Sequence, residues 1–391
     1  MRRTDLALAG ATALLLAVAA CGGGGGIGGT GTAHGTMRVA LTDAPACGYD
    51  EVNVTVEKVR VHRSSTAGDA DGGWEEIVLA PARRIDLRTL TNGVVEELGE
   101  TTLPAGRYTQ LRLVLAENSP ATPLANSVLP TGGTEVALDT PSAQQTGLKI
   151  NVDLDVPPEQ VLDVVLDFDA CKSVVRRGNS GLYNLKPVLT ATPMLSDAGL
   201  RVIGYVEPAL GLPSTIVSVQ QDGVPAKSTE PDATGRFVLY PVPAGTYDLV
   251  VAPQGRPPPV RPGVPVPPTA YTPLNSPPVP IAPPAAASAP RAVTGTVSPP
   301  EATLRALQSF TGGPTFEAAS ASVDADTGEF DFSLPVVAPV KTAYVANPAS
   351  FTWTPDAAAG LYTIEAALGA ATQTEPIDAK AVVPPITFVF P

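Results

Sequence analysis

Histidine and cysteine are scarce in this sequence, with two and three residues among 391. His34 falls in a glycine-rich segment, and His62 ends a segment that alternates like a strand, where we expect a surface position. Two isolated histidines provide no Ser-His-Asp triad and no imidazole-rich zinc site. A phosphate-binding loop would need glycines directly after a strand, and the run Gly22–Gly26 follows none. The sequence therefore predicts no catalytic residues, no metal site of this kind and no bound cofactor.

Aromatic and basic residues are also few. Aromatic side chains make up 5% of the chain, and 25 lysines and arginines stand against 38 aspartates and glutamates, which gives a formal net charge of -13. Nucleic-acid binding needs a basic stripe with interleaved aromatic side chains, and an acidic surface repels phosphate backbones. We therefore expect no nucleic-acid partner and no charge-driven hold on anionic lipid.

Proline, by contrast, is abundant: the 43 prolines are about twice ordinary usage. Proline removes a backbone donor and breaks helices, so the chain should consist of short strands, turns and linkers. Hydrophobic residues reach 44%, which is enough for packed cores. Together these proportions predict strands rather than helices. With the alternating segments along the chain, we expect an all-β protein built from tandem antiparallel β-sandwich domains.

Residues 1–20 are predicted to be a signal peptide. Arg2 and Arg3 precede an apolar run, Leu6–Ala20, which is too short to span a membrane and fits the core of a signal peptide. The run ends in Val-Ala-Ala directly before Cys21, a pattern that resembles a bacterial lipobox. In a lipobox the cysteine takes a diacylglycerol and the peptide bond before it is cut. An ordinary signal peptide with a chance cysteine is the alternative.

A lipid on Cys21 would anchor the chain to a membrane. Gly22 follows the cysteine, and by resemblance to known lipoprotein sorting this favours the outer membrane. Residues 21–36 are mostly glycine, threonine and alanine. Such a segment has no core to bury, so we predict a flexible tether. The folded part would then stand outside the cytoplasm, in the cell envelope.

Residues 37–193 are predicted to form one β domain, here called the first domain. Apolar and polar residues alternate in several of its segments, and within 52–61 the phase slips by one position, which indicates a β-bulge near Glu57. The clearest alternation covers 148–156 and 162–170, on either side of a proline pair. We interpret these two segments as the strands of one hairpin.

Two further β modules are predicted after the first domain. Residues 200–283 form the second module, residues 284–290 a linker and residues 291–391 the third module. The third module repeats features of the second: a valine-rich opening with a central glycine, a Thr-Gly turn before a phenylalanine, and a glycine two residues before a tyrosine. The first domain shares the last feature at Gly106 and Tyr108. We interpret these repeats as structural corners rather than as chemistry.

Seven places in the first domain share the pattern of one family: residues 41–45, 54–62, Trp74, 103–115, 147–149, 166–170 and 185–188. In them the domain resembles a family of bacterial secreted lipoproteins known only as domain of unknown function 4382. The resemblance implies a fold and a location, but no activity. The Asp-Ala-Thr-Gly-Arg-Phe and Pro-Ala-Gly-Thr-Tyr stretches of the second module resemble the carboxypeptidase regulatory-like, transthyretin-like sandwiches. That likeness implies a spacer or binding role, and the third module matches it more loosely.

Five aspartates would share the outward face of the proposed hairpin: Asp153, Asp155, Asp163, Asp167 and Asp169. Three interpretations are open. The face is solvated and protects a sheet edge from aggregation, or it binds a calcium ion that relieves the repulsion between carboxylates, or two of the carboxylates act as the acid and base of a glycosidase. We favour the solvated face, because no compact loop with calcium-style ligand spacing accompanies it.

The sequence as a whole predicts a non-enzymatic lipoprotein of the cell envelope that acts as a binding or scaffolding module. Its partners would be the membrane, through the N-terminal lipid, and an envelope protein or glycan. The alternatives are an envelope hydrolase that uses paired carboxylates and a purely structural spacer. The fold-level analogy supports this function only by association.

The lipid anchor can be tested at the lipobox cysteine. We expect Cys21→Ser to release a soluble or uncleaved form, because serine has no thiol to take the lipid. Detergent phase partitioning of the variant and the wild type measures the difference. If the variant partitions with membrane as the wild type does, the anchor lies elsewhere.

The two remaining cysteines, Cys47 and Cys171, are predicted to form a disulfide bond. Both follow predicted strands of the first domain, and a free pair would be unusual in an oxidising compartment. The chain-entropy model gives about 5 kcal/mol for a loop of this size. Thiol labelling of the denatured protein should therefore succeed only after reduction, and the melting temperature should then fall by several degrees. Two reactive thiols without reduction would contradict the bond.

Overall fold

The computed structural model describes residues 33–44, 48–141, 146–194, 199–210, 215–283, 285 and 288–391. Nearly all regular structure in these residues is β-strand in mostly antiparallel sheets, which confirms the predicted all-β class. The short helical segments are η1 (Leu87–Leu90), α2 (Ala170–Ser173) and η2 (Pro208–Leu210). Within the described ranges, no helix is long and apolar enough to span a membrane. The predicted signal peptide, Cys21 and Cys47 lie outside the described residues.

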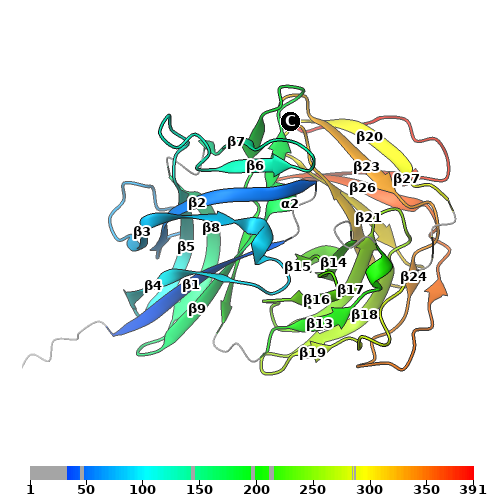
Figure 1. The fold of residues 1–391 in the computed structure, drawn as a ribbon, viewed down its shortest axis with the longest axis horizontal. Helices are drawn as coiled ribbons and strands as arrows, with labels where there is room; N and C mark the ends of the chain where they lie inside the picture. The colour runs from blue at the N-terminus through cyan, green and yellow to red at the C-terminus, as the bar shows by residue number, and fades with distance from the viewer. Residues whose placement is uncertain are drawn as a thin grey trace, which may run out of the picture. The chain divides into compact units, whose positions relative to one another are not determined.

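The first domain consists of two sheets around one apolar core (Figure 1). The four-stranded sheet has the order β12-β9-β1-β4, with β1 (His34–Ala44), β4 (Glu96–Pro104), β9 (Val161–Asp169) and β12 (Leu189–Met194). The eight-stranded sheet holds β2 (Tyr49–His62), β3 (Glu75–Asp86), β5 (Gly106–Leu115), β6 (Ser127–Pro130), β7 (Val136–Asp139), β8 (Leu148–Val156), β10 (Val174–Arg176) and β11 (Tyr183–Leu185).

The first strand, β1, begins at His34, inside the segment predicted as a tether. His34 pairs with Pro104 at the end of β4. Gly35 is buried so closely against the turn after β8 that an added Cβ would come within 2.2 Å of the carbonyl oxygen of Pro157. Glycine and threonine carry no hydrophobic alternation, so the sequence pattern could not reveal that these residues extend the sheet.

The hairpin predicted from 148–156 and 162–170 is wrong, although both segments are strands. β8 pairs antiparallel with β5, whereas β9 pairs parallel with β1 and antiparallel with β12. The two strands therefore lie in different sheets, and the turn between them carries the chain from one sheet to the other. Period-two alternation shows which side chains face the core, but it does not show which strand lies alongside.

The predicted bulge in β2 is confirmed. The register of β2 shifts between Val56 and Lys58 against both neighbouring strands, β3 and β5. The extra residue restores the inward phase, so that Val56 and Val59 are both fully buried in the core.

The second module contains a three-stranded and a six-stranded sheet. The smaller sheet holds β13 (Val202–Tyr205), β16 (Arg236–Leu239) and β19 (Thr272–Pro273). The larger one holds β14 (Thr215–Gln221), β15 (Val224–Thr229), β17 (Gly245–Pro253) and β18 (Pro259–Val266), and it is completed by β24 (Val340–Lys341) and β25 (Thr354–Pro355). β24 and β25 belong to the third module in sequence but complete a sheet of the second module. The sheets therefore do not follow the predicted border between the modules.

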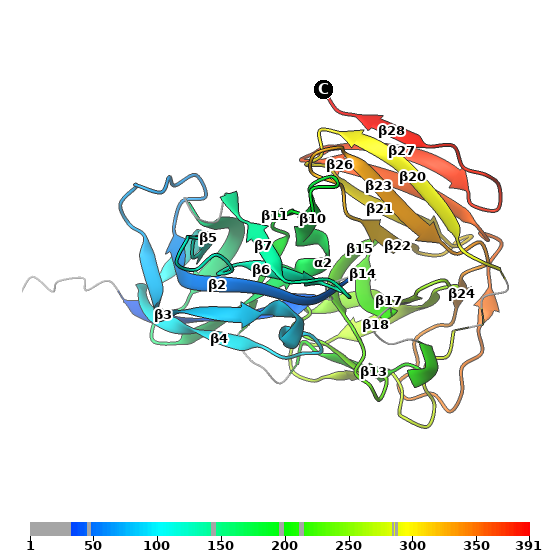
Figure 2. The same ribbon diagram turned by 45° about the horizontal axis from the view of Figure 1, so that its top comes forward.

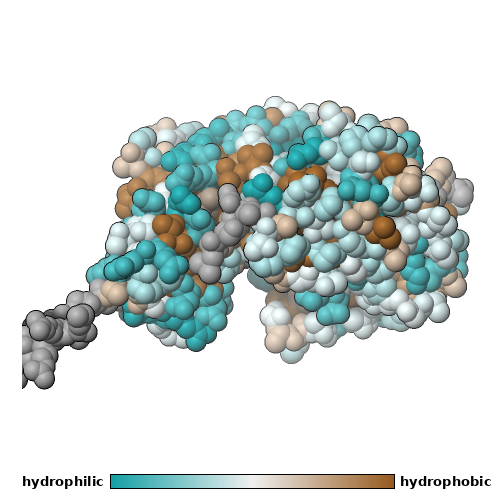
Figure 3. Space-filling model, turned by 90° about the horizontal axis from the view of Figure 1, so that it is seen from below, coloured by the Kyte–Doolittle hydropathy of each residue, from teal (hydrophilic) through white to brown (hydrophobic). Residues whose placement is uncertain are grey.

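The third module has its own pair of sheets, whose strands Figure 2 shows together. One sheet holds β20 (Arg291–Ser298), β23 (Glu329–Leu334) and β28 (Ile386–Val389). The other holds β21 (Thr303–Ser309), β22 (Thr315–Ala321), β26 (Leu361–Leu368) and β27 (Ala371–Asp378). Apolar side chains pack inside the modules. On the face shown in Figure 3, hydrophobic residues at the surface form separate areas within a mostly hydrophilic surface.

The repeated glycines of the two modules make the same close contact. An added Cβ on Gly204 would come within 2.6 Å of the ring of Phe237, and one on Gly295 would come within 2.5 Å of Phe330. Only glycine lets the first strand of each module lie this close to the phenylalanine that follows the Thr-Gly turn. The repeat in the sequence thus marks a repeated packing contact.

The repeated tyrosines are corner residues. Tyr108 and Tyr247 each donate their hydroxyl hydrogen to the carbonyl oxygen of a proline four residues upstream, at 2.9 Å. Tyr362 has Ala358 in the corresponding place, and it donates instead to the carbonyl oxygen of Pro335, at 2.7 Å. The prediction that these positions serve the architecture therefore agrees with their contacts.

Candidate functional site

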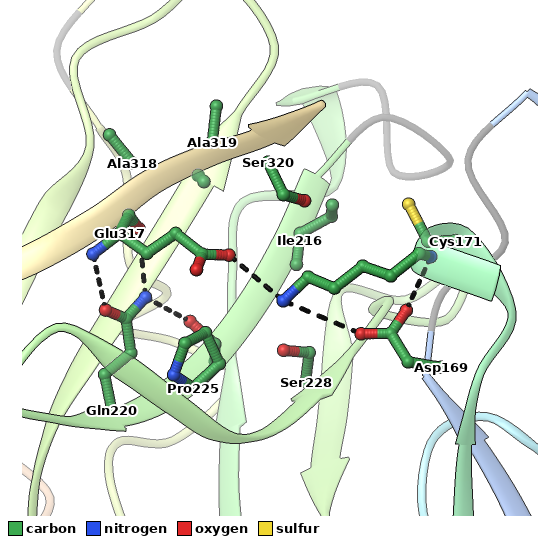
Figure 4. Close-up of a pocket in the computed structure, with 13 residues that line it drawn as sticks. Asp169, Cys171, Ile216, Gln220, Pro225, Ser228, Glu317, Ala318, Ala319 and Ser320 are labelled. Carbon is green, nitrogen blue, oxygen red and sulfur yellow. Dashed lines mark hydrogen bonds and ion pairs between the residues drawn. The ribbon is translucent and has the colours of Figure 1, made fainter. Parts of the chain in front are cut away.

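A pocket lies where the first domain and the two modules meet (Figure 4). Its empty volume is about 450 Å³, which includes space open to solvent. The end of β9 and α2 line one side, β14, β15 and β17 another, and β22 the third. The lining residues are Asp169, Cys171, Lys172, Ile216, Ser218, Gln220, Pro225, Ser228, Ala252, Glu317, Ala318, Ala319 and Ser320. Because ligand sites often lie at domain interfaces, we treat this pocket as the candidate site.

The ammonium group of Lys172 lies between two carboxyl groups in the pocket. It lies 3.2 Å from Oε1 of Glu317 and 3.7 Å from Oδ2 of Asp169, and Figure 4 draws these contacts as dashed lines. Burial raises the pKa of both carboxyl groups against the attraction of Lys172. Burial by itself would lower the pKa of Lys172, but the two acidic neighbours outweigh it, and the pKa is raised. The lysine stays charged and joins the first domain to the third module.

Gln220, on β14, fixes the position of Glu317. Its side-chain nitrogen donates to the main-chain oxygen of Glu317 at 3.0 Å, and its side-chain oxygen accepts from the main-chain nitrogen at 2.7 Å. Gln220 is only 2% exposed, and a buried amide needs such partners. These bonds form only when β14 and β22 lie together, so all three parts of the described chain meet at Glu317.

A second buried ion pair lies between the first domain and the second module. Nζ of Lys227, on β15, donates to Oδ1 of Asp167, on β9, at 2.6 Å. The side chains of Lys227 and Asp167 are 1% and 14% exposed. The same ammonium group also reaches the main-chain oxygen of Asp43 at 3.4 Å. Because both charges are removed from water, each depends on the other for its compensation.

Asp43, near the end of β1, is fully buried beside this pair. Its Oδ1 accepts a hydrogen bond from the main-chain nitrogen of Ala170 at 3.0 Å, and its Oδ2 is buried without a partner. Desolvation raises the pKa of Asp43 well above its usual range, helped by Asp169 and Asp167 and opposed by the Ala170 bond and Lys227. Asp43 therefore holds its proton at pH values at which exposed aspartates are ionised.

The single acidic face predicted for five aspartates does not form. Asp153 pairs with Arg107 on β5, at 2.5 Å, and Asp163 pairs with Arg38 on β1, also at 2.5 Å. Asp155 is exposed on β8. Asp167 and Asp169 lie on β9, in the same sheet as Asp163, and face the module junction. Among the described residues, no group of three or more histidine, cysteine or acidic side chains is placed to hold a metal ion.

The cysteine predictions fall partly outside the described residues. Cys171 lies in α2 and lines the pocket, but Cys47 and Cys21 belong to segments that the structure does not describe. The lipid on Cys21 and the bond between Cys47 and Cys171 therefore stay predictions.

Sequence reasoning missed the residues that build the junction, and only one of them carried a signal. Asp43 continues the inward alternation of Met37, Val39 and Leu41. A carboxyl group at the next core-facing position of a strand indicates a buried acid. Lys172, Lys227 and Glu317 lie in strands and a short helix without such a pattern, so nothing local marked them.

The charged groups of the junction are held by fixed partners, which limits their chemistry. Asp167 accepts from Lys227, and Asp169 caps α2 by accepting from the main-chain nitrogen of Lys172 at 3.0 Å. A general acid or base must reach the proton of a substrate. Carboxylates committed in this way are better suited to clamp domains together than to transfer protons.

The buried proton on Asp43 predicts a pH dependence. The unfolded carboxyl group ionises near pH 4, while the folded one keeps its proton. The free energy of unfolding should thus fall as pH rises towards the folded pKa, by about 1.4 kcal/mol per pH unit. Asparagine does not titrate, so the stability of Asp43→Asn relative to wild type should increase with pH. Urea unfolding between about pH 4.5 and 8 measures this.

Asp155→Asn, which changes an exposed carboxylate of the same domain, is the matched control and should follow the wild-type pH profile. Parallel profiles for Asp43→Asn and wild type would show that Asp43 is ionised in the fold.

Comparison with known proteins gives a family match for the first domain. Residues 34–187 match the family model described as Domain of unknown function (DUF4382). No curated protein matches the chain. The matched residues include Asp43, Asp167 and Asp169, so the first domain's side of the junction lies within the family region. Residues 34–187 of this chain are a DUF4382 domain, followed by further β-rich modules.

Proposed function

We propose that this chain is a non-enzymatic lipoprotein of the cell envelope that acts as a binding or scaffolding module. The signal-peptide pattern and the lipobox at Cys21 support an anchor in the outer membrane. The partners that we propose are the membrane, through the lipid, and an envelope protein or glycan. The turn and corner contacts of the second module support its assignment as a carboxypeptidase regulatory-like sandwich.

The observation that carries the proposal is the way in which the three β parts are locked together. Lys227 pairs with Asp167 between the first domain and the second module, and Lys172 pairs with Glu317 between the first domain and the third module. β24 of the third module pairs with β18 of the second. Domains that move independently would not need buried polar contacts at each border, whereas a rigid scaffold does.

A loop of the first domain adds to this lock at the edge of β16. The side-chain oxygen of Asn92 accepts from the main-chain nitrogen of Val238 at 2.6 Å, and its main-chain nitrogen donates to the hydroxyl of Thr229 at 2.8 Å. Gly93 has a φ of 81°, and an added Cβ there would come within 2.7 Å of Val238. These bonds hold the loop against the second module, which supports a fixed spacing of the parts.

The contacts of Asp167 and Asp169 favour binding over hydrolysis. In a glycosidase one carboxyl group protonates the leaving group and the other stabilises or attacks the sugar, so both must face the substrate. Here Asp167 faces a buried lysine and Asp169 caps a helix. These partners support a structural use of both carboxylates.

Removing the buried ammonium group tests the scaffold. Lys227→Met should destabilise the chain by about 3–5 kcal/mol, because Asp167 would be left buried without its counter-charge. Calorimetry should show the transition of the first domain separating from that of the modules. The control Lys58→Met breaks the more exposed pair with Glu76, 3.2 Å long, and should cost at most about 1 kcal/mol. Equal effects of the two variants would argue against a rigid junction.

The non-enzymatic part of the proposal has its own test. We expect the purified full-length chain to show no turnover in a screen of glycosides and esters. Activity that disappears in Asp167→Asn or Asp169→Asn, while both variants stay folded by circular dichroism, would establish the hydrolase alternative instead.

A further inference from the structure

Arg261 is a positive charge at a core-facing position of β18. It lies opposite Leu249 of β17, on the face that carries the core of the second module. Its side chain is 1% exposed and is among the largest fully buried side chains of the chain. Arginine is rarely buried to this degree unless an acidic group compensates it.

No carboxylate lies within ion-pair distance of Arg261 among the described residues. Nη1 donates to the main-chain oxygen of Leu274 at 3.0 Å and Nη2 to that of Val345 at 2.9 Å, while Nε is buried without a partner. The guanidinium carbon lies 5.5 Å from the ring centre of Tyr344 and 4.9 Å from that of Phe351. Burial lowers the pKa of Arg261 to about 10. The charge is thus shielded by rings and carbonyl groups but is not neutralised.

Part of the cover over Arg261 comes from the third module, through Tyr344, Val345 and Phe351. Main-chain nitrogens of Val340, Thr342 and Tyr344 donate to carbonyl oxygens of residues 258, 260 and 262, which fixes the first part of this segment to β18. Residues 345–353, here called the tip, make no such main-chain bonds to other segments among the described residues. The tip is therefore held mainly by side-chain contacts.

Those side-chain contacts are made with Arg261 and with the apolar core of the second module, against which Phe351 and Trp353 pack. The main-chain oxygen of Val345 accepts a hydrogen bond from Arg261, and Val345 is itself 59% exposed. Phe351 lies over the guanidinium, and Trp353 stacks on Phe351 with ring centres 5.2 Å apart and planes 18° apart. Moving the tip away would uncover the cation and free the two aromatic rings that the tip itself carries.

We propose that the tip is a lid over a binding site for carboxylate ligands that carry a ring, with Arg261 as the residue that recognises the carboxylate. The planar guanidinium matches a carboxylate with two parallel hydrogen bonds. A carboxylate would replace the oxygen of Val345 and supply the missing counter-charge, and the ring of the ligand would stack on the freed aromatic side chains. This site is separate from the junction pocket, and the proposal does not depend on the scaffold role.

The two tryptophans, Trp74 and Trp353, provide a direct readout. In the full chain with Trp74→Phe, Trp353 is the sole tryptophan, and its emission should change in a saturable way when benzoate is added. Benzamide has the same shape without the charge and should bind at least tenfold more weakly. Arg261→Gln should abolish the response, and Arg261→Lys should weaken it, because lysine keeps the charge but loses the planar fork.

A second variant keeps the test valid if Arg261→Gln does not fold. Phe351→Leu leaves Arg261 in place, and calorimetric titration should show weaker benzoate binding because the stacking ring is lost. Equal responses to benzoate and benzamide would overturn the proposal. So would a titration that shows no saturation even at benzoate concentrations well above about 1 mM. Arg261 would then serve only to pin the tip to the second module.

Discussion

The ammonium group of Lys227, in the second module, is buried against the four-stranded sheet of the first domain. The joining of these two parts depends on that buried charge. Its carboxylate partner, Asp167, lies on β9, in the centre of the four-stranded sheet. Neither charge can be left alone in this setting, because an unpaired buried ion costs several kcal/mol. The pair therefore stabilises the relative position of the two sheets that brings its charges together. Asp43 keeps its proton beside the pair, because burial above all raises its pKa.

Polar contacts also determine the other borders, and apolar contacts fill the space around them. Both ends of the Gln220 amide form hydrogen bonds with the main chain of Glu317. These bonds require the two strands to match in position as well as in polarity. Small apolar clusters accompany these bonds, with Val165 and Val238 at one border and Val260 and Phe316 at another. Apolar packing is tolerant of direction, whereas buried hydrogen bonds are not, so the polar groups decide the geometry of the assembly.

The second and third modules show how one sandwich plan is adapted to a joined structure. Both use the same glycine–phenylalanine contact and a corner tyrosine. In the third module the proline four residues before the tyrosine is absent, and Tyr362 bonds to Pro335, where the long segment between β23 and β26 begins. That segment leaves its own module, extends the sheet of the second module and covers Arg261. The departure from the repeat is thus the part that links the modules.

The sequence by itself determined the strand class, the inward face of each strand, the bulge in β2 and the turns and corners of the modules, because each depends on neighbouring residues and on a period of two. It could not determine which strands lie side by side: 148–156 and 162–170 show the same alternation whether they form a hairpin or face each other from two sheets. Nor could it bring Lys227 to Asp167, 60 residues away, or Lys172 to Glu317. Those pairs depend on how complete sheets pack, and only the tertiary structure decides which charges are buried together and which, like Arg261, are left without an acidic partner.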